Sequence, residues 1–207
     1  MKLGLISDIH GDIVALELAW AHLTVFGADR IVCAGDLVGY GPHPDRVVAF
    51  LAERGIDSVR GNHDRWALHR GPGVPDAFGG GTPSPETIET LKTLPADRVI
   101  ADGPRVGVIT HGSPGNDMDY VTRTTHPPAL LRSMLGKLGA DLLLVGHTHR
   151  PMWYRSGPGL VVNPGSVVSA PVVSTSRTFA LLDWDQAALT FHDVETGATV
   201  AVEPWAD

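Results

Sequence analysis

Short, mainly apolar runs recur along the chain, and each ends at glycine or a polar residue. Runs of this length with such ends are typical of buried β-strands. Up to about residue 147 the runs alternate with segments that carry helix-start and helix-stop signals, and strands dominate after it. The first five predicted strands each precede a polar motif, and they cover residues 3–6, 31–34, 58–60, 106–109 and 142–145.

Four helices are predicted between these strands. Asp12 can cap the first helix, and a proline at the first position favours the start of the other three. Glycine follows the first, second and fourth of these segments, where it favours a helix end. The predicted helices cover residues 12–27, 44–55, 85–94 and 128–138.

The last part of the chain predicts four further strands, at residues 152–154, 160–162, 178–182 and 189–191. Together these elements predict two packed mixed sheets flanked by helices, which is a layered α/β/β/α architecture of the α/β class. We expect one domain over residues 1–207. The segment 71–85 is rich in glycine and proline, and we expect it to form a mobile loop beside the functional site.

Composition and charge narrow the class of protein. Of the 207 residues, 43% are hydrophobic and 19% are charged, as in ordinary globular proteins, and a net charge of −7 argues against broad nucleic-acid binding. No apolar stretch is long enough to span a bilayer, and Asp8 comes too early for a signal-peptide core, so we expect a cytoplasmic protein. The only cysteine, Cys33, lies in a predicted strand and is expected to be a buried thiol. No feature indicates the oligomeric state.

Metal-ligating side chains follow the predicted strands directly. Because the carboxyl ends of strands meet at one edge of an open α/β sheet, these side chains are expected to converge there. Asp8 and His10 are two residues apart and could share one cation, while Asp36 has two carboxylate oxygens and could bridge two cations. His147 and His149 could each serve one metal. The predicted ligands are Asp8, His10, Asp36, Asn62, His111, His147 and His149.

The motifs Asp-x-His, Gly-Asp, Gly-Asn-His-Asp, a single His and Gly-His-x-His occur in this order over residues 8–149. This ordered set resembles the calcineurin-like metallophosphoesterase superfamily, and residues 163–166 resemble its small bacterial and archaeal phosphodiesterase branch. The resemblance implies that His63 faces the substrate, that Asp64 orients its imidazole, and that Asn62 also touches a phosphate oxygen. It implies one metal on Asp8, His10, Asp36 and His149, and a second on Asp36, Asn62, His111 and His147.

The mixture of imidazole, carboxylate and amide ligands predicts two divalent transition-metal ions. We expect manganese, with iron, nickel, cobalt or zinc as alternatives. Such a positively charged site suits a small phosphate ester, which would be hydrolysed by metal-activated hydroxide with His63 as general acid. The alternative from another class of function is a protein-binding scaffold of the same fold, as in the retromer subunit that resembles this family. Because that branch loses ligands or the general acid, and this chain keeps both, the enzyme is favoured.

The second motif bears on the kind of ester. Branches that act on phosphoproteins or symmetrical dinucleoside polyphosphates carry Gly-Asp-x-Val-Asp-Arg-Gly, whereas residues 35–41 read Gly-Asp-Leu-Val-Gly-Tyr-Gly. Without the arginine that grips a doubly charged phosphate, we predict a preference for phosphodiesters, with nucleotide-derived esters as the expected class. Arg65 or Arg70 could supply that cation from another loop. A phosphomonoesterase or a dinucleoside polyphosphate hydrolase therefore stays open. Four further side chains lie next to the motifs: Tyr40, His43, Arg65 and Trp66. Each is expected either to contact substrate or to pack beside the site.

Overall fold

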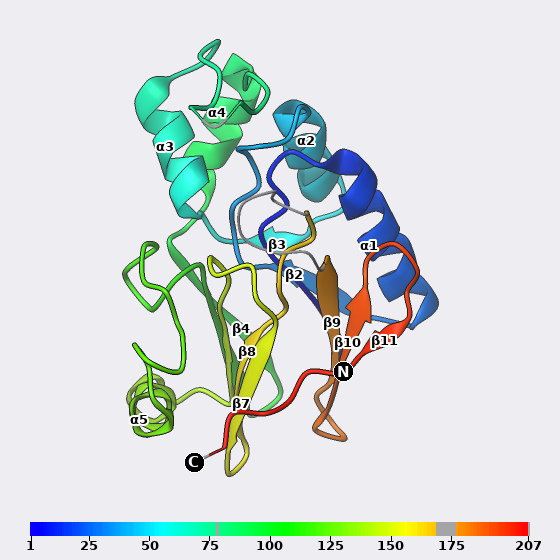
Figure 1. Cartoon of the computed structure of the whole chain (residues 1–207), viewed down its shortest axis with the longest axis vertical. Helices are drawn as coiled ribbons and strands as arrows, with labels where there is room; N and C mark the ends of the chain where they lie inside the picture. Colours follow the sequence, from blue (N-terminus) through cyan, green and yellow to red (C-terminus); the bar gives the residue numbers. More distant parts are fainter. Residues whose placement is uncertain (78, 169–176, 207) are drawn as a thin grey trace.

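Two mixed β-sheets pack against each other, with helices on both outer faces (Figure 1). The computed structural model describes residues 1–77, 79–168 and 177–206. The first sheet has the strand order β11-β10-β9-β1-β2-β3, in which β1, β2 and the edge strand β3 are parallel. Its strands are β1 (Lys2–Ile6), β2 (Arg30–Cys33), β3 (Asp57–Ser58), β9 (Thr178–Asp183), β10 (Ala188–Asp193) and β11 (Thr199–Val200).

The second sheet has the order β4-β5-β6-β8-β7, with β5, β6 and β8 parallel and an antiparallel strand at each edge. Its strands are β4 (Asp97–Asp102), β5 (Arg105–Thr110), β6 (Leu142–Leu144), β7 (Met152–Ser156) and β8 (Gly159–Asn163). The helices are α1 (Ile13–Val25), α2 (Pro44–Glu53), α3 (Asn62–Arg70), α4 (Pro85–Thr93) and α5 (Pro128–Leu138).

The alternation of side chains along the strands explains the layers. Leu3 and Leu5 of β1 point into the core between the sheets, whereas Ile6 packs in the cluster under α1 and α2. In β6, Leu142 and Leu144 join the core between the sheets, and the intervening residue faces the cluster under α5. The predicted layered α/β/β/α class is therefore confirmed.

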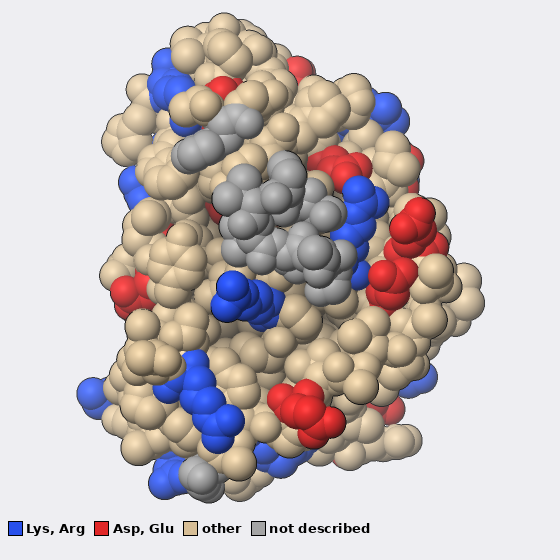
Figure 2. All heavy atoms as spheres, viewed as in Figure 1, with Lys and Arg blue, Asp and Glu red and all other residues tan. Residues whose placement is uncertain are grey.

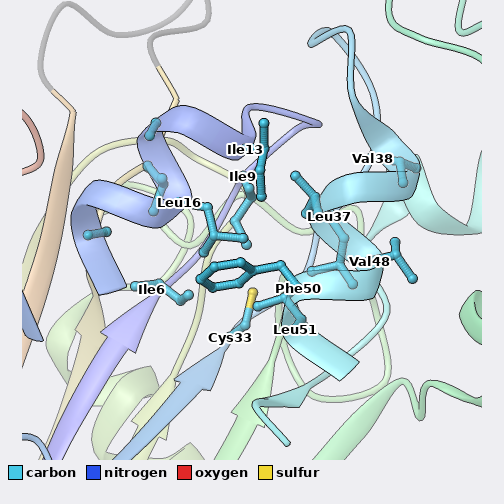
Figure 3. Packing of buried hydrophobic residues seen from close by; sticks show 14 of the residues in the cluster. Ile6, Ile9, Ile13, Leu16, Cys33, Leu37, Val38, Val48, Phe50 and Leu51 are labelled. Atoms are coloured by element: carbon cyan, nitrogen blue, oxygen red, sulfur yellow. The ribbon is translucent and has the colours of Figure 1, made fainter. Parts of the chain in front are cut away.

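The cluster beneath α1 and α2 ties these helices to the first sheet. Figure 3 shows the ring of Phe50 reaching from α2 toward Leu16 of α1 and Cys33 of β2. Cys33 is fully buried, as predicted, and burial raises the pKa of its thiol far above the usual value. The packing of this cluster therefore fixes the positions of the carboxyl ends of β1 and β2.

The four predicted helices are confirmed, with ends shifted by up to two residues. Asp12 caps α1 by accepting a hydrogen bond from the backbone N–H of Ala15 at 3.0 Å. The short helix α3 and the edge strands β4 and β11 were not predicted. In β4 only Ile100 is buried, so the strand lacks the apolar run that marks the others. The predicted strand at 58–60 was wrong in position, since β3 ends at Ser58.

The glycine- and proline-rich segment 71–85 connects α3 to α4, and Phe78 within it lies outside the described residues. On the face shown in Figure 2, basic and acidic side chains are interspersed. None of the described helices combines the length and apolar character that a membrane-spanning helix requires.

Candidate metal centre

The predicted site residues converge at the carboxyl ends of strands from both sheets. Asp8 and His10 follow β1, Asp36 follows β2, His111 follows β5, and the His147 to His149 segment follows β6. The remaining predicted residues open α3, just beyond β3. All of them are buried: Asp8, His10, Asp36, Asn62, His63, Asp64, His111, His147 and His149.

The backbone at the centre is strained. Positive φ angles, between 48° and 66°, occur at Asp8, His10, Asp36, His147 and His149. Residues with a Cβ rarely adopt this conformation, and clusters of such residues are typical of functional sites. Hydrogen bonds between neighbouring segments stabilise it, because the backbone N–H groups of Ile9 and His10 both donate to the carbonyl of Asp36 at 2.9 Å.

Two motif glycines make room for the ligands. A Cβ on Gly61 would lie 2.2 Å from Asp36 Oδ1, and one on Gly146 would lie 2.1 Å from Ser7 Oγ. Asn163 supports the Gly146 segment, since its Nδ2 donates to the Gly146 carbonyl at 2.7 Å. These contacts explain why glycine precedes the side chains that form the centre.

One group of donors comprises Asp8, His10 and His149, whose ligand atoms lie within 4.8 Å of one another. Asp8 Oδ2 accepts hydrogen bonds from Ser7 Oγ at 2.7 Å and from the His147 backbone N–H at 3.1 Å. Its other oxygen, Oδ1, faces the imidazoles, 3.3 Å from His149 Nε2 and 3.8 Å from His10 Nε2. The group therefore presents one carboxylate oxygen and two ring nitrogens to a common point.

A second group comprises Asp36, His111 and His147. Asp36 Oδ1 accepts a hydrogen bond from the His63 backbone N–H at 2.8 Å, and Oδ2 lies 3.2 Å from His111 Nε2. Asn62 Oδ1 is 3.0 Å from the same imidazole nitrogen. Asp36 Oδ2 is also 3.8 Å from His10 Nε2, so Asp36 lies between the two groups.

Two imidazoles are oriented by backbone carbonyls. His10 Nδ1 lies 3.2 Å from the Val38 carbonyl, and His111 Nδ1 lies 2.7 Å from the Ala34 carbonyl. An Nδ1–H that donates to a carbonyl directs Nε2 inward, which is the nitrogen that a metal would bind. Among the described residues, no hydrogen-bond partner reaches Asp8 Oδ1 or His147 Nε2, although both atoms are buried. The donor set therefore fits divalent transition-metal ions.

Burial and neighbouring charges shift the pKa values of the ionisable side chains at the centre. Burial alone would raise the pKa of Asp8, but the charge of the neighbouring His149 imidazole lowers that pKa to about 2. Burial lowers the pKa of His10 to about 4. For His111 burial is outweighed by the charge of Asp36 and the hydrogen bond to it, and the pKa rises to about 10. The carboxylate of Asp8 is thus ionised at neutral pH.

A family model described as the calcineurin-like phosphoesterase superfamily domain matches residues 1–187. The chain belongs to this superfamily. The resemblance inferred from the motifs is thereby confirmed, and so is the prediction of a metal-dependent phosphoesterase.

Relatives of this metallophosphoesterase match over nearly its full length. It is 28% identical over 219 residues to the phosphodiesterase YfcE of Escherichia coli strain K12, covering 99% of this chain and 100% of that protein. It is 31% identical over 206 residues to a probable metallophosphoesterase of Methanothermobacter thermautotrophicus, covering 97% and 95%. The solved structure of a metallophosphoesterase from Sphaerobacter thermophilus has 27% identity and a TM-score of 0.72, covering 94% of this chain and 88% of that chain.

Backbone N–H donors surround the carboxylate of Asp64 in this metallophosphoesterase. The carboxylate of Asp64 accepts backbone hydrogen bonds from Leu37, Val38 and Gly61 at 2.9 to 3.1 Å. The role predicted for Asp64, orienting the His63 imidazole, stays a prediction, and these contacts place its carboxylate against the backbone of the second motif. Burial and the charge of Asp36 raise the pKa of Asp64 to about 7, while the backbone N–H donors favour its ionised form. Asp64 joins the second motif to the start of α3.

Aromatic rings surround His63. The rings of His10, Tyr40 and Trp66 each lie with their centroids 4.8 Å from that of His63. A third group of potential metal donors contains His10, Asp36 and His63, so His63 is close enough to a metal to bind it. Proximity alone therefore leaves two roles for His63, ligand and proton donor.

The other flanking residues have distinct places. Arg65 makes a two-bond ion pair with Asp117, at 2.6 and 2.9 Å, and His43 is an exposed residue at the start of α2. Tyr120 was not predicted as a site residue, yet its ring lies 4.3 Å from that of His147 and its surface is 53% exposed. Tyr120 lies in the loop that begins at His111, but no motif marks it in the sequence. Tyr40 and Tyr120 thus flank opposite groups of donors.

Proposed function

We propose that this metallophosphoesterase hydrolyses phosphodiesters at a centre of two divalent metal ions, with manganese as the expected metal. The observation that supports two metals is the presence of two donor groups with Asp36 between them. The residues proposed to hold one metal are Asp8, His10, Asp36 and His149, and those for the other are Asp36, Asn62, His111 and His147.

When bound, two such ions lower the pKa of a shared water and stabilise the negative charge of the phosphoryl oxygens. The carboxylates of Asp8 and Asp36 only partly neutralise the centre, so it attracts an anionic phosphate ester. Asn62 adds an uncharged amide that can also contact a phosphate oxygen. His63, from the first turn of α3, protonates the departing alkoxide as general acid.

The proposed preference for a diester rests on the arginine side chains near the site. The second motif has no arginine, and both arginines that could replace it are paired with carboxylates. Arg65 binds Asp117 through two hydrogen bonds, and Arg70 Nη2 lies 2.6 Å from Asp76 Oδ2. A paired guanidinium is less able to grip the second negative charge of a phosphomonoester. The name of the relative YfcE, a phosphodiesterase, agrees with this proposal, and nucleotide-derived diesters are the class we propose as natural substrates.

The test compares kcat/KM for bis(4-nitrophenyl) phosphate and 4-nitrophenyl phosphate with the same metal. We expect a ratio of at least about tenfold in favour of the diester, since the missing guanidinium contributes more to a dianion. A ratio in favour of the monoester would refute the diesterase proposal and leave the metal centre in place. Titration of the metal-free protein with manganese should reach two ions per chain.

A further inference from the structure

A buried carboxylate outside the predicted site lies beside His63. Asp76 Oδ2 is 3.9 Å from His63 Nδ1, and the side chain of Asp76 is only 2% exposed. Asp76 belongs to the segment between α3 and α4, and Arg70, the last residue of α3, donates a hydrogen bond to the same oxygen at 2.6 Å. The guanidinium thus holds the carboxylate in place from the helix that also contains His63.

The second motif explains why the carboxylate comes from this segment. In the pattern Gly-Asp-x-Val-Asp-Arg-Gly, the second aspartate corresponds to Gly39 of this chain, and the arginine corresponds to Tyr40. A Cβ on Gly39 would lie 2.5 Å from His63 Nδ1, so the imidazole occupies the space where a side chain at position 39 would begin. The chain therefore has no acidic side chain at this position, and Asp76 approaches the same ring nitrogen from another loop.

Building on the proposed function, we propose that Asp76 is the positioning residue for His63. A carboxylate that faces Nδ1 sets the orientation of an imidazole and directs Nε2 away from itself. The rings of His10, Tyr40 and Trp66 restrict the same imidazole on its other sides. Among the described residues, Asp76 belongs to none of the groups of potential metal donors, so we infer that it acts through His63.

The chemical step that depends on this orientation is the departure of the leaving group. A water oxygen that has lost a proton forms a new bond to phosphorus as the P–O bond to that group breaks. The electron pair of the broken bond moves to the leaving oxygen, which receives the proton from His63. The imidazole regains a proton from water after the products leave, and Asp76 is unchanged. An imidazole turned away from the leaving oxygen would slow this transfer most for basic leaving groups, which depend most on protonation.

The experiment uses methyl aryl phosphates that differ only in the phenol, from 4-nitrophenol through 4-chlorophenol to phenol. For Asp76→Asn we expect kcat to fall about tenfold or more with phenol as leaving group and less than about threefold with 4-nitrophenol. Metal content and KM should stay near the wild-type values. In a His63→Gln background, Asp76→Asn should cause no further loss, because both changes remove the same contribution.

The matched control is Asp117→Asn, which removes the carboxylate partner of another arginine on α3. This variant should keep the wild-type dependence on the leaving group. Equal losses across the series for Asp76→Asn, or an added loss in the His63→Gln background, would overturn the positioning role. If Asp76→Asn does not fold, Arg70→Gln decides: a smaller change of the same kind supports the role, and an unchanged leaving-group dependence overturns it. Wild-type protein without any turnover of these diesters would instead refute the proposed function, and this inference with it.

Discussion

The imidazoles of His10 and His149 face each other with their Nε2 atoms 3.0 Å apart. Because His10 donates its Nδ1 hydrogen to the Val38 carbonyl, its Nε2 has a free lone pair, and His149 has to donate from Nε2. His149 Nδ1 is then buried, and no hydrogen-bond partner reaches it among the described residues. A cation bound by both Nε2 atoms and Asp8 Oδ1 would replace the hydrogen between the two imidazoles.

Replacing Asp36 with alanine tests the proposed bridge between the two metals. The change removes an anion from between two cations and a ligand from both, so Asp36→Ala should lose both metals and activity. His149→Ala should weaken one metal and leave the other largely bound. Elemental analysis of the purified variants measures this directly, and two retained metals in Asp36→Ala would rule out the bridging role.

Replacing His63 separates chemistry from metal binding. If His63 is a general acid and not a ligand, His63→Gln should keep both metals while kcat for an alkyl leaving group falls by about a hundredfold or more. The loss should be smaller for 4-nitrophenol, a stable leaving group. Loss of a metal from this variant would instead assign His63 to the third donor group, with His10 and Asp36.

Asp64 should matter for stability more than for proton transfer. Its carboxylate accepts hydrogen bonds from three buried backbone N–H groups, so Asp64→Ala should destabilise the fold by about 2–5 kcal/mol. Asp117→Ala, at a partly exposed ion pair, should cost less than about 1 kcal/mol. Urea unfolding of the metal-free proteins gives both values. If the two variants were equally stable, Asp64 would not be the residue that connects the second motif to α3.

Metal binding should release protons at mildly alkaline pH. In the metal-free protein the pKa of His111 is raised to about 10, so the folded chain keeps a proton there that an unfolded chain loses near pH 6.5. The stability from this protonated imidazole is complete below pH 6.5 and is lost as the pH rises toward 10. Because a metal requires the neutral imidazole, metal affinity should increase over the same range. Calorimetry at pH 8 in buffers of different ionisation enthalpy measures the proton release, and its absence would contradict the prediction.

Much of this protein can be predicted from its sequence because the relevant signals are local. Proline, glycine and capping residues mark four of the five helices in the described part of the chain, and apolar runs mark the central strands. The ligand types follow these runs directly, so the rule that parallel strands meet at one edge predicts their convergence. Helix α3 also has local signals, because Asp64 caps it by accepting a hydrogen bond from the Gly61 backbone N–H, and Gly71 follows its end.

Other features depend on contacts between segments that are distant in the sequence. The resemblance of the motifs to the superfamily implies a carboxylate beside His63 and assigns it to Asp64. Only the packing of α3 shows that Asp64 is occupied by backbone N–H groups and that Asp76 faces the imidazole. Likewise, the positive φ angles of the ligands arise from hydrogen bonds between neighbouring loops. The sequence thus determines which donor types reach the edge of the sheets, and the tertiary structure decides which of them face each other, because orientation depends on neighbours from several segments at once.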